Sequence, residues 1–190
     1  WDLRCRRAGL PLWRMAGGAR NRVPLYTTEG GWLHLPIEAL VSDAVAMKEA
    51  GFSGAKIKIG KASIAEDRAR LSAVRAAVGD AFLIMVDANQ SFSLAEAKRR
   101  ADMLAEFGIH WFEEPMPADD VGAHRELSRH SRVPIAVGES LYSLSQFKDY
   151  LACGAAQVVQ ADVARVGGIT PWLKIAHLAE AINVPVCPHF

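Results

Sequence analysis

The stretch FLIMVDANQSFSLAEAKRRADMLAEFGIHWFEE, residues 82–114, contains the repeating unit that decides the fold. Residues 82–86 form a continuous apolar run, which is typical of a buried strand. Ser93, with Glu96 three positions later, matches a capping box and predicts the start of a helix. Residues 109–112 predict the next strand. A strand, a helix and a strand in this order predict a parallel βαβ unit.

The same alternation extends from this unit towards both ends of the chain. Further strands are predicted at residues 23–27, 55–59, 134–137, 157–160 and 184–187. Helices are predicted over residues 36–50, after a capping box of Ser63 and Glu66, and after Thr170 as N-cap with Pro171 in the first helical position. This order indicates either a doubly wound open sheet or a (β/α)8-type barrel.

Two features favour the barrel. No glycine-rich phosphate loop follows the first strand, as it would in a Rossmann-type sheet. Polar residues recur just past the end of strand after strand, where barrels carry their active sites. We therefore expect an α/β fold, a barrel of the (β/α)8 type. Because about seven strands fall short of a complete barrel of ~250 residues, we expect the last strand to be absent and one edge to be open.

The composition excludes several other classes of protein. The chain is 51% hydrophobic with a formal net charge of +1, which predicts one well-packed domain and no surface for nucleic acid or an anionic membrane. No apolar run approaches the ~20 residues that span a bilayer, and neither end resembles a signal peptide. The scattered Cys5, Cys153 and Cys187 predict reduced thiols. We therefore expect a soluble, cytoplasmic protein.

Two lysines, Lys56 and Lys58, lie in the predicted strand at residues 55–59. Side chains two apart on a strand share a face, so both ammonium groups enter the barrel mouth if Ile57 packs against the helices. Two cations there need carboxylates or an anionic substrate as partners. Their mutual repulsion would lower a lysine pKa towards the useful range for a base. An edge strand with two solvated lysines is the alternative.

The next three strands each end in at least one carboxylate. Asp87 ends the third strand, Glu113 and Glu114 the fourth, and Glu139 the fifth. A single acid in such a place often caps a helix or forms a salt bridge. Three on consecutive strands, next to two lysines, instead predict a hard-oxygen site suited to Mg²⁺.

The sixth and seventh strands add Asp162 and His189. A carboxylate on a neighbouring strand can hold a histidine in one tautomer and raise its basicity. A structural histidine is the alternative. We favour a functional one because His189 stands at the same barrel level as the other candidates.

Six motifs together resemble the barrel domain of the enolase superfamily, mandelate racemase subgroup: KIK (56–58), VDANQ (86–90), FEEP (112–115), VGES (137–140), ADVARVGG (161–168) and PHF (188–190). The spacing of these motifs also resembles that subgroup, and the resemblance covers essentially the whole chain. It implies an α/β fold, a modified TIM-type (β/α)7β barrel. It also implies that residues 1–20 are the tail of an N-terminal α+β capping domain that is otherwise absent. Residues 21–190 would be a partial barrel domain.

In that superfamily, a Lys or His base works with Mg²⁺ to stabilise an enediolate. The resemblance assigns three residues to the metal: Asp87, Glu113 and Glu139. It implies that Lys58 is the base on one face of the substrate, and that His189, paired with Asp162, is the acid or base on the opposite face.

The resemblance also implies contacts around these groups. Lys56 would contact the substrate carboxylate and lower the pKa of Lys58. Asn89 and Glu114 lie beside metal ligands and would support them or contact the substrate. Arg165 would meet a distal substrate carboxylate, or form a salt bridge beneath its loop.

The motifs at the sixth and seventh strands resemble acid-sugar dehydratases of the galactarate/talarate type more than mandelate racemase itself. Asp162 stands where muconate-cycloisomerase-like members usually have a lysine. The resemblance therefore implies a lyase that removes the α-proton of a small carboxylate substrate, a sugar acid, and then dehydrates it. A racemase or epimerase and an inactive barrel fragment are the alternatives. The full-length protein is expected to be a homo-oligomer.

Overall fold

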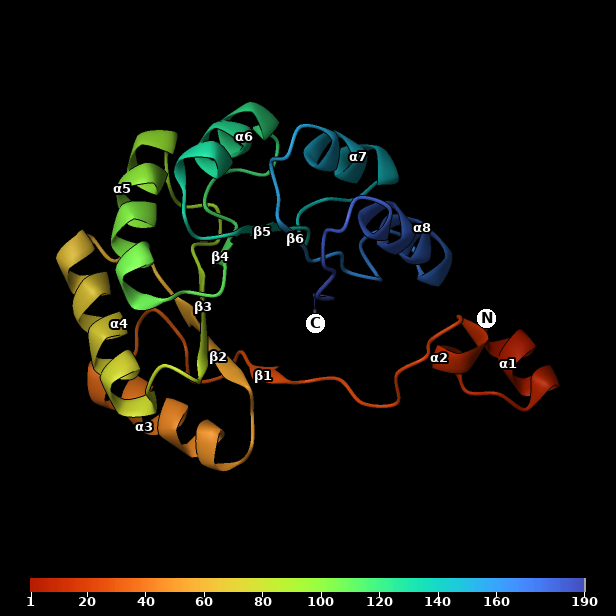
Figure 1. The fold of residues 1–190 in the computed structure, drawn as a ribbon, viewed down its shortest axis with the longest axis horizontal. Coiled ribbons are helices and arrows are strands. Elements are labelled where there is room, and N and C mark those ends of the chain that lie inside the picture. Colours follow the sequence, from red (N-terminus) through yellow and green to blue (C-terminus); the bar gives the residue numbers. More distant parts are fainter. Residues whose placement is uncertain (190) are drawn as a thin grey trace.

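The computed structural model describes residues 1–189. Its single sheet has six parallel strands in the order of the chain. They are β1 (Tyr26–Thr27), β2 (Gly54–Lys58), β3 (Leu83–Asp87), β4 (Phe112–Glu113), β5 (Ile135–Val137) and β6 (Val158–Val159). The strands curve into an open arc, and the helices that connect them lie on its outer side (Figure 1). This is the predicted α/β partial barrel.

The outer helices are α3 (Ile37–Glu49), α4 (Ile64–Val78), α5 (Leu94–Leu104), α6 (Val121–His130), α7 (Leu144–Ala152) and α8 (Ile169–Glu180), with a short 3₁₀ turn, η1 (Ala105–Phe107), after α5. The predicted capping box of Ser63 and Glu66 starts α4, and the Ser93 side chain accepts the backbone N–H of Glu96 at the start of α5. The predicted N-cap of α8 is wrong, because the helix begins after Gly168. The Thr170 hydroxyl instead accepts the indole N–H of Trp1 at 2.9 Å.

The alternation of side chains along the strands separates two apolar clusters. The outward-facing residues of the strands join the helices in the main core, which includes Ile57, Ile84, Phe112, Ile135 and Val159. The inward-facing residues form a smaller cluster of Met85, Trp111, Ala136 and Val158. This smaller cluster fills the inside of the arc. The polar side chains at the carboxyl ends of the strands therefore lie on a layer of packed apolar side chains.

The seventh predicted strand, residues 184–187, is not a regular strand. The chain from residue 184 to residue 189 instead forms two isolated parallel bridges, between Val159 and Val186 and between Asp162 and His189. Pro185 lacks the N–H that a continuous ladder requires. The segment nevertheless occupies the seventh position, and the second bridge places His189 beside Asp162.

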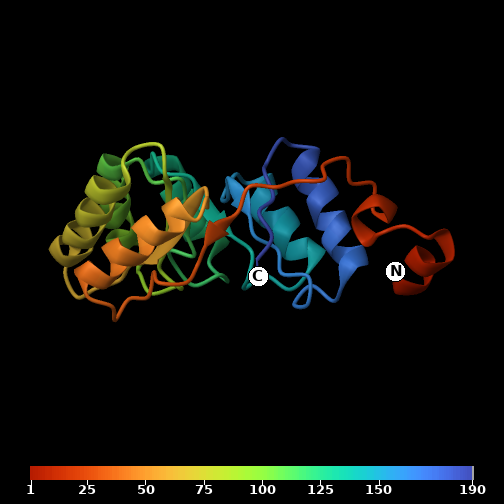
Figure 2. The ribbon, with the colours of Figure 1, turned by 90° about the horizontal axis from the view of Figure 1, so that it is seen from below.

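The first strand is also shorter than predicted, because only Tyr26 and Thr27 pair with β2. The preceding residues run away from the arc to α1 (Asp2–Ala8) and α2 (Leu12–Met15), which lie beyond α8 (Figure 2). None of the helices in residues 1–189 is both long and apolar enough to cross a lipid bilayer.

Candidate active site

Three carboxylates converge at the carboxyl ends of neighbouring strands. The register pairs Lys58 with Asp87 and Asp87 with Glu113, so these side chains share one level of the arc. Glu139 follows β5 after Gly138, where any Cβ would lie 2.4 Å from the Gln160 carbonyl carbon. One oxygen from each of Asp87, Glu113 and Glu139 lies within 4.8 Å of the others. The predicted carboxylate cluster is therefore present.

The two lysines of β2 point into this cluster, and the alternative of solvated lysines on an edge strand is wrong. Ile57 packs in the main core, on the opposite face. The Lys56 ammonium lies 2.6 Å from Glu113 Oε1 and 3.3 Å from Asp87 Oδ2. The Lys58 ammonium lies 2.5 Å from Asp87 Oδ2. Burial opposes the charged form of Lys56, but Glu113 and Asp87 outweigh it and raise its pKa.

Glu113 is a buried candidate metal ligand, with 1% of its surface exposed. Burial, followed by the charge of Asp87, raises the pKa of its carboxyl. Its Oε2 accepts the Gln160 amide at 2.9 Å and the Trp111 indole N–H at 3.1 Å, while Oε1 accepts Lys56. The sequence analysis missed Gln160, although it lies two residues before Asp162 and so shares its face.

His189 and Asp162 form the predicted pair. The imidazole Nδ1 lies 2.9 Å from Asp162 Oδ2, and Nε2 lies 3.1 Å from Glu139 Oε2. The other oxygen of Asp162 accepts the backbone N–H groups of Ala164 and Arg165 at 2.8 and 2.9 Å. The N–H of Arg165 first, and then His189, lower the pKa of Asp162. These contacts favour the ionised form of the Asp162 carboxylate and keep its Oδ2 beside the imidazole Nδ1 of His189.

The carboxylate cluster consequently lies between two groups that can transfer protons. Lys58 contacts Asp87, at the β3 side of the cluster. His189 contacts Glu139, which follows β5. A substrate bound over the cluster would therefore have a nitrogen base on each side.

The remaining candidates support the loops around the cluster. Asn89 Oδ1 accepts the Lys58 ammonium at 2.7 Å. Arg165 donates to the Glu139 carbonyl at 2.5 Å and lies 3.7 Å from Glu139 Oε1, so the structure shows the salt-bridge alternative for this residue. Buried Glu114 has one oxygen, Oε1, without a hydrogen-bond partner among residues 1–189.

Gln90 is a second residue that the sequence analysis missed. Its amide donates to Ser140 Oγ at 2.8 Å, and its Oε1 accepts the backbone N–H of Ala118 at 2.9 Å. One side chain thereby joins the loops that follow β3, β4 and β5. Only its position in the motif VDANQ indicated a role.

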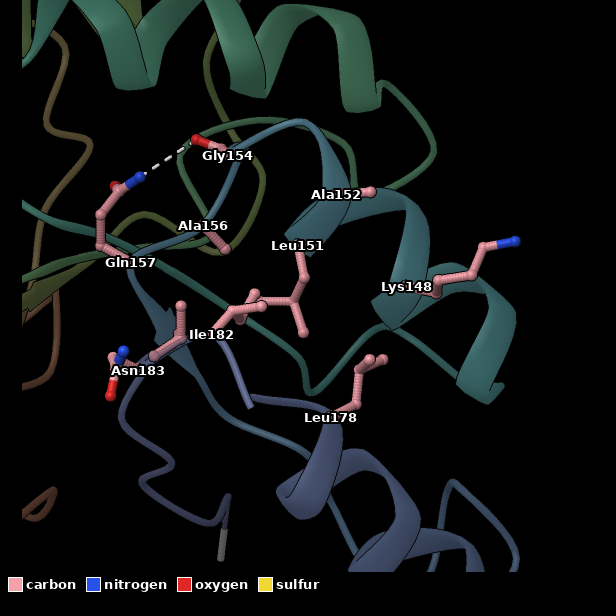
Figure 3. A pocket seen from close by; sticks show the side chains of 10 residues that line it. Lys148, Leu151, Ala152, Gly154, Ala156, Gln157, Leu178, Ile182 and Asn183 are labelled. Atoms are coloured by element: carbon pink, nitrogen blue, oxygen red, sulfur yellow. Dashed lines mark hydrogen bonds between the residues drawn. The ribbon is translucent and has the colours of Figure 1, made fainter. Parts of the chain in front are cut away.

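A separate apolar cavity of about 640 Å³ lies between α7 and α8 (Figure 3). Leu151, Leu178 and Ile182 line it, together with Gln157, which precedes β6. Because the carboxylates follow their strands, this cavity lies towards the other end of the sheet. It contains none of the candidate site residues.

Comparisons with known proteins agree with this geometry. A family model described as enolase C-terminal domain-like matches residues 39–190. L-talarate/galactarate dehydratase of Salmonella typhimurium is 42% identical over all of this chain, which covers 48% of that protein. For 3,6-anhydro-alpha-L-galactonate cycloisomerase of Streptomyces coelicolor the identity is 40%, again over the whole chain, with 52% of that protein covered.

A solved structure shares the same architecture. L-talarate dehydratase from Polaromonas sp. JS666, complexed with Mg and L-glucarate, superimposes with a TM-score of 0.96 at 44% identity, covering 100% of this chain and 51% of that one. The chain spans about half the length of the curated relatives it matches. On the family match and these identities, the chain belongs to the enolase superfamily, within the C-terminal barrel domain of the mandelate racemase/muconate lactonizing enzyme group.

Proposed function

We propose that this chain forms part of a Mg²⁺-dependent dehydratase that acts on a sugar-derived acid. One observation carries the proposal: the cluster of Asp87, Glu113 and Glu139 lies between Lys58 and the pair of His189 and Asp162. We also assign residues 1–20 to the end of an N-terminal capping domain and residues 21–190 to the barrel domain.

The donor set fits a hard divalent cation. All three groups offer carboxylate oxygens, within 4.8 Å of one another, and oxygen ligands are those that Mg²⁺ prefers. When bound, the cation supplies electrostatic stabilisation to the substrate carboxylate as negative charge develops on it. Lys56, whose ammonium lies beside Glu113, would contact the same carboxylate.

The proton transfers fall to the two flanking bases. Lys58 Nζ, or His189 Nε2 on the other face, takes the proton from the carbon beside the carboxylate. The electron pair of that C–H bond then forms the new C=C bond as the bond to the β-hydroxyl breaks. Protonated His189, held by Asp162 at 2.9 Å, gives its proton to the departing oxygen, which leaves as water. A positioned acid contributes about 10²–10⁴-fold, because hydroxide is a poor leaving group.

The same residues support racemisation or epimerisation as a second candidate. In that reaction the base on the opposite face returns a proton to the α-carbon, and no C–O bond breaks. Identity to dehydratases of acid sugars favours dehydration, while the cycloisomerase relative shows that such a barrel also serves isomerases. An inactive barrel is the third alternative.

The test uses the full-length protein. Calorimetric titration with Mg²⁺ should show binding to the wild type and much weaker binding to Glu113→Gln; equal affinities would remove the metal assignment. The wild type is then assayed on mono- and diacid sugars for 2-keto-3-deoxy products. Stereo-inverted acids without any keto product would indicate the racemase.

His189→Asn separates the two proton transfers. We expect this variant to lose dehydration while Lys58 still exchanges the α-proton with D₂O, which mass spectrometry detects. A wild type that binds Mg²⁺ but neither exchanges nor dehydrates any acid would indicate the inactive barrel.

A further inference from the structure

We propose that Gln160 and Trp111 are positioning residues that leave Glu113 a single oxygen for the metal, and that they thereby favour Mg²⁺ over the larger Ca²⁺. This selectivity rests on the proposed function, because it presupposes the metal site of Asp87, Glu113 and Glu139. The three carboxylates do not supply it by themselves, since both cations bind carboxylate oxygens.

The Glu113 carboxylate has almost no free acceptor capacity. An ionised carboxylate offers about four lone-pair sites, two on each oxygen. Oε2 accepts the Gln160 amide at 2.9 Å and the Trp111 indole N–H at 3.1 Å, so both of its sites are taken. Among residues 1–189, Oε1 accepts only the Lys56 ammonium, at 2.6 Å, which leaves one site. A metal ion in the carboxylate cluster would therefore meet Glu113 through Oε1 alone.

Water cannot easily replace the two donors on Oε2. Glu113, Gln160 and Trp111 are each no more than 5% exposed. Both donors are also neutral, so they occupy Oε2 without adding a positive charge that would repel a cation. Their effect therefore differs from that of the Lys56 ammonium, whose charge competes with a metal ion for the same carboxylate.

The orientation of the Gln160 amide follows the charge of Glu113. Its own oxygen, Oε1, is buried and has no hydrogen-bond partner among residues 1–189. Turning the amide over would place this oxygen against the Glu113 carboxylate, and the two acceptors would repel each other. The structure thus leaves one buried oxygen of Gln160 unsatisfied while its N–H group is directed at Glu113, which indicates that the donor has a role at the carboxylate.

The backbone fixes both donors. The Gln160 N–H, directly after β6, donates to the Val137 carbonyl of β5 at 2.8 Å. The Trp111 carbonyl, directly before β4, accepts the Val86 N–H of β3 at 3.0 Å. The Trp111 ring also packs edge-on against Tyr26 of β1, with 5.4 Å between the ring centroids. The donors therefore reach Glu113 from opposite sides of the sheet (Figure 1), and neither can follow the carboxylate if it rotates.

The two cations differ in how many oxygens they need. Mg²⁺ requires near-octahedral geometry at about 2.0–2.1 Å, whereas Ca²⁺ takes about 6–8 oxygens and accepts a carboxylate through one or both of them. A glutamate that can offer only one oxygen suits Mg²⁺. The donors on Oε2 consequently act against Ca²⁺, because they prevent Glu113 from supplying the second oxygen.

The test measures the affinities of the full-length protein for Mg²⁺ and for Ca²⁺ in separate calorimetric titrations. Gln160→Met keeps an unbranched side chain of similar length and removes the amide donor. We expect the wild type to bind Mg²⁺ more tightly than Ca²⁺. Gln160→Met should weaken Mg²⁺ about 10–100-fold, as is typical when a partner of a metal ligand is lost. It should weaken Ca²⁺ less, because one site on Oε2 is then free, so the ratio of the two affinities falls.

Trp111→Phe removes the other donor and should lower the same ratio, so the result does not depend on one variant. Gln157→Met is the matched control. Gln157, at the other end of β6, donates its amide to Ser128 Oγ at 2.6 Å and lies away from the carboxylate cluster. Its substitution should lower the thermal midpoint without changing the ratio of the affinities.

Two results would overturn the inference, and they are distinguishable. If Gln160→Met and Trp111→Phe weaken both cations equally, the donors only stabilise a buried carboxylate; the selectivity is then wrong, while the Mg²⁺ site stands. If the wild type binds neither cation, the metal site of the proposed function is itself wrong, and the selectivity with it. Neither readout depends on turnover of any acid.

Discussion

The buried ammonium of Lys56 offers a sharp test of how the active-site charges balance. Its side chain is 7% exposed and contacts Glu113 and Asp87 at 2.6 and 3.3 Å. Substitution Lys56→Met keeps an unbranched side chain, shorter by the terminal nitrogen, and removes the charge. Asp87 retains Lys58 as a partner, but Glu113 loses its only cation among the described contacts.

The size of the effect is limited by protonation of Glu113. A buried carboxylate that has lost its cation can take up a proton, which at pH 7 costs about 3.7 kcal/mol for a glutamate with a reference pKa of ~4.3. Breaking a buried ion pair costs about 3–5 kcal/mol, in agreement. We therefore expect Lys56→Met to lose up to about 3.7 kcal/mol at pH 7, or roughly 7–15 °C in thermal midpoint for a domain of this size.

The pH dependence has a defined sign. Burial and the charge of Asp87 already raise the pKa of Glu113, and Lys56 opposes them, so the substitution raises this pKa further. A carboxyl whose pKa is higher in the folded state binds more protons when folded, so stability falls as pH rises. The deficit of the variant should be about 1 kcal/mol at pH 5 and should grow towards pH 7.

Thermal unfolding of the full-length protein at pH 5, 6 and 7, with EDTA or with Mg²⁺, measures both effects. Mg²⁺ would replace the missing positive charge, so it should raise the midpoint of Lys56→Met more than that of the wild type. Lys98→Met is the control for an exposed ion pair, with an expected cost below about 1 kcal/mol. A deficit that is the same at every pH, together with equal shifts by Mg²⁺, would refute the reasoning.

Two further predictions concern the partner of His189 and the backbone of β2. Asp162→Asn removes the carboxylate 2.9 Å from the imidazole, so kcat for dehydration should fall about 10²–10⁴-fold with a smaller change in KM, as measured by steady-state kinetics; an unchanged kcat would exclude the pair from catalysis. Gly31→Ala would place a Cβ 1.9 Å from the Lys56 carbonyl oxygen, so β2 must shift and the thermal midpoint should fall. Gly122→Ala, whose Cβ meets its nearest neighbour at 3.5 Å, should leave the midpoint unchanged or raise it.

Local features of the sequence predicted most of the fold. Buried parallel strands are short apolar runs, and a capping box such as Ser63 with Glu66 marks a helix start within four residues. Predictions failed where a distant contact decided the outcome. Thr170 has the chemistry of an N-cap, yet its hydroxyl accepts Trp1, which lies at the other end of the chain.

Local features of the sequence also predicted most of the candidate site. The alternation of side chains along a strand places Lys56 and Lys58 on one face whatever surrounds them, and an acid at the carboxyl end of a parallel strand must lie at the mouth of the sheet. These statements require only the period of a strand and its direction. They identified the carboxylate cluster, the lysines and the pair of Asp162 and His189.

Sequence alone therefore determined which side chains stand at the mouth of the barrel, because that depends on local periodicity. Tertiary structure decided how they pair: the register places Lys56 between Glu113 and Asp87, and Gln160 reaches Glu113 from two strands away. It also decided that the Arg70 guanidinium donates to the Trp32 carbonyl and the Arg100 guanidinium to the Lys61 carbonyl. Such contacts join residues far apart in the chain, and their geometry is set by how the helices pack on the sheet, which no local pattern encodes.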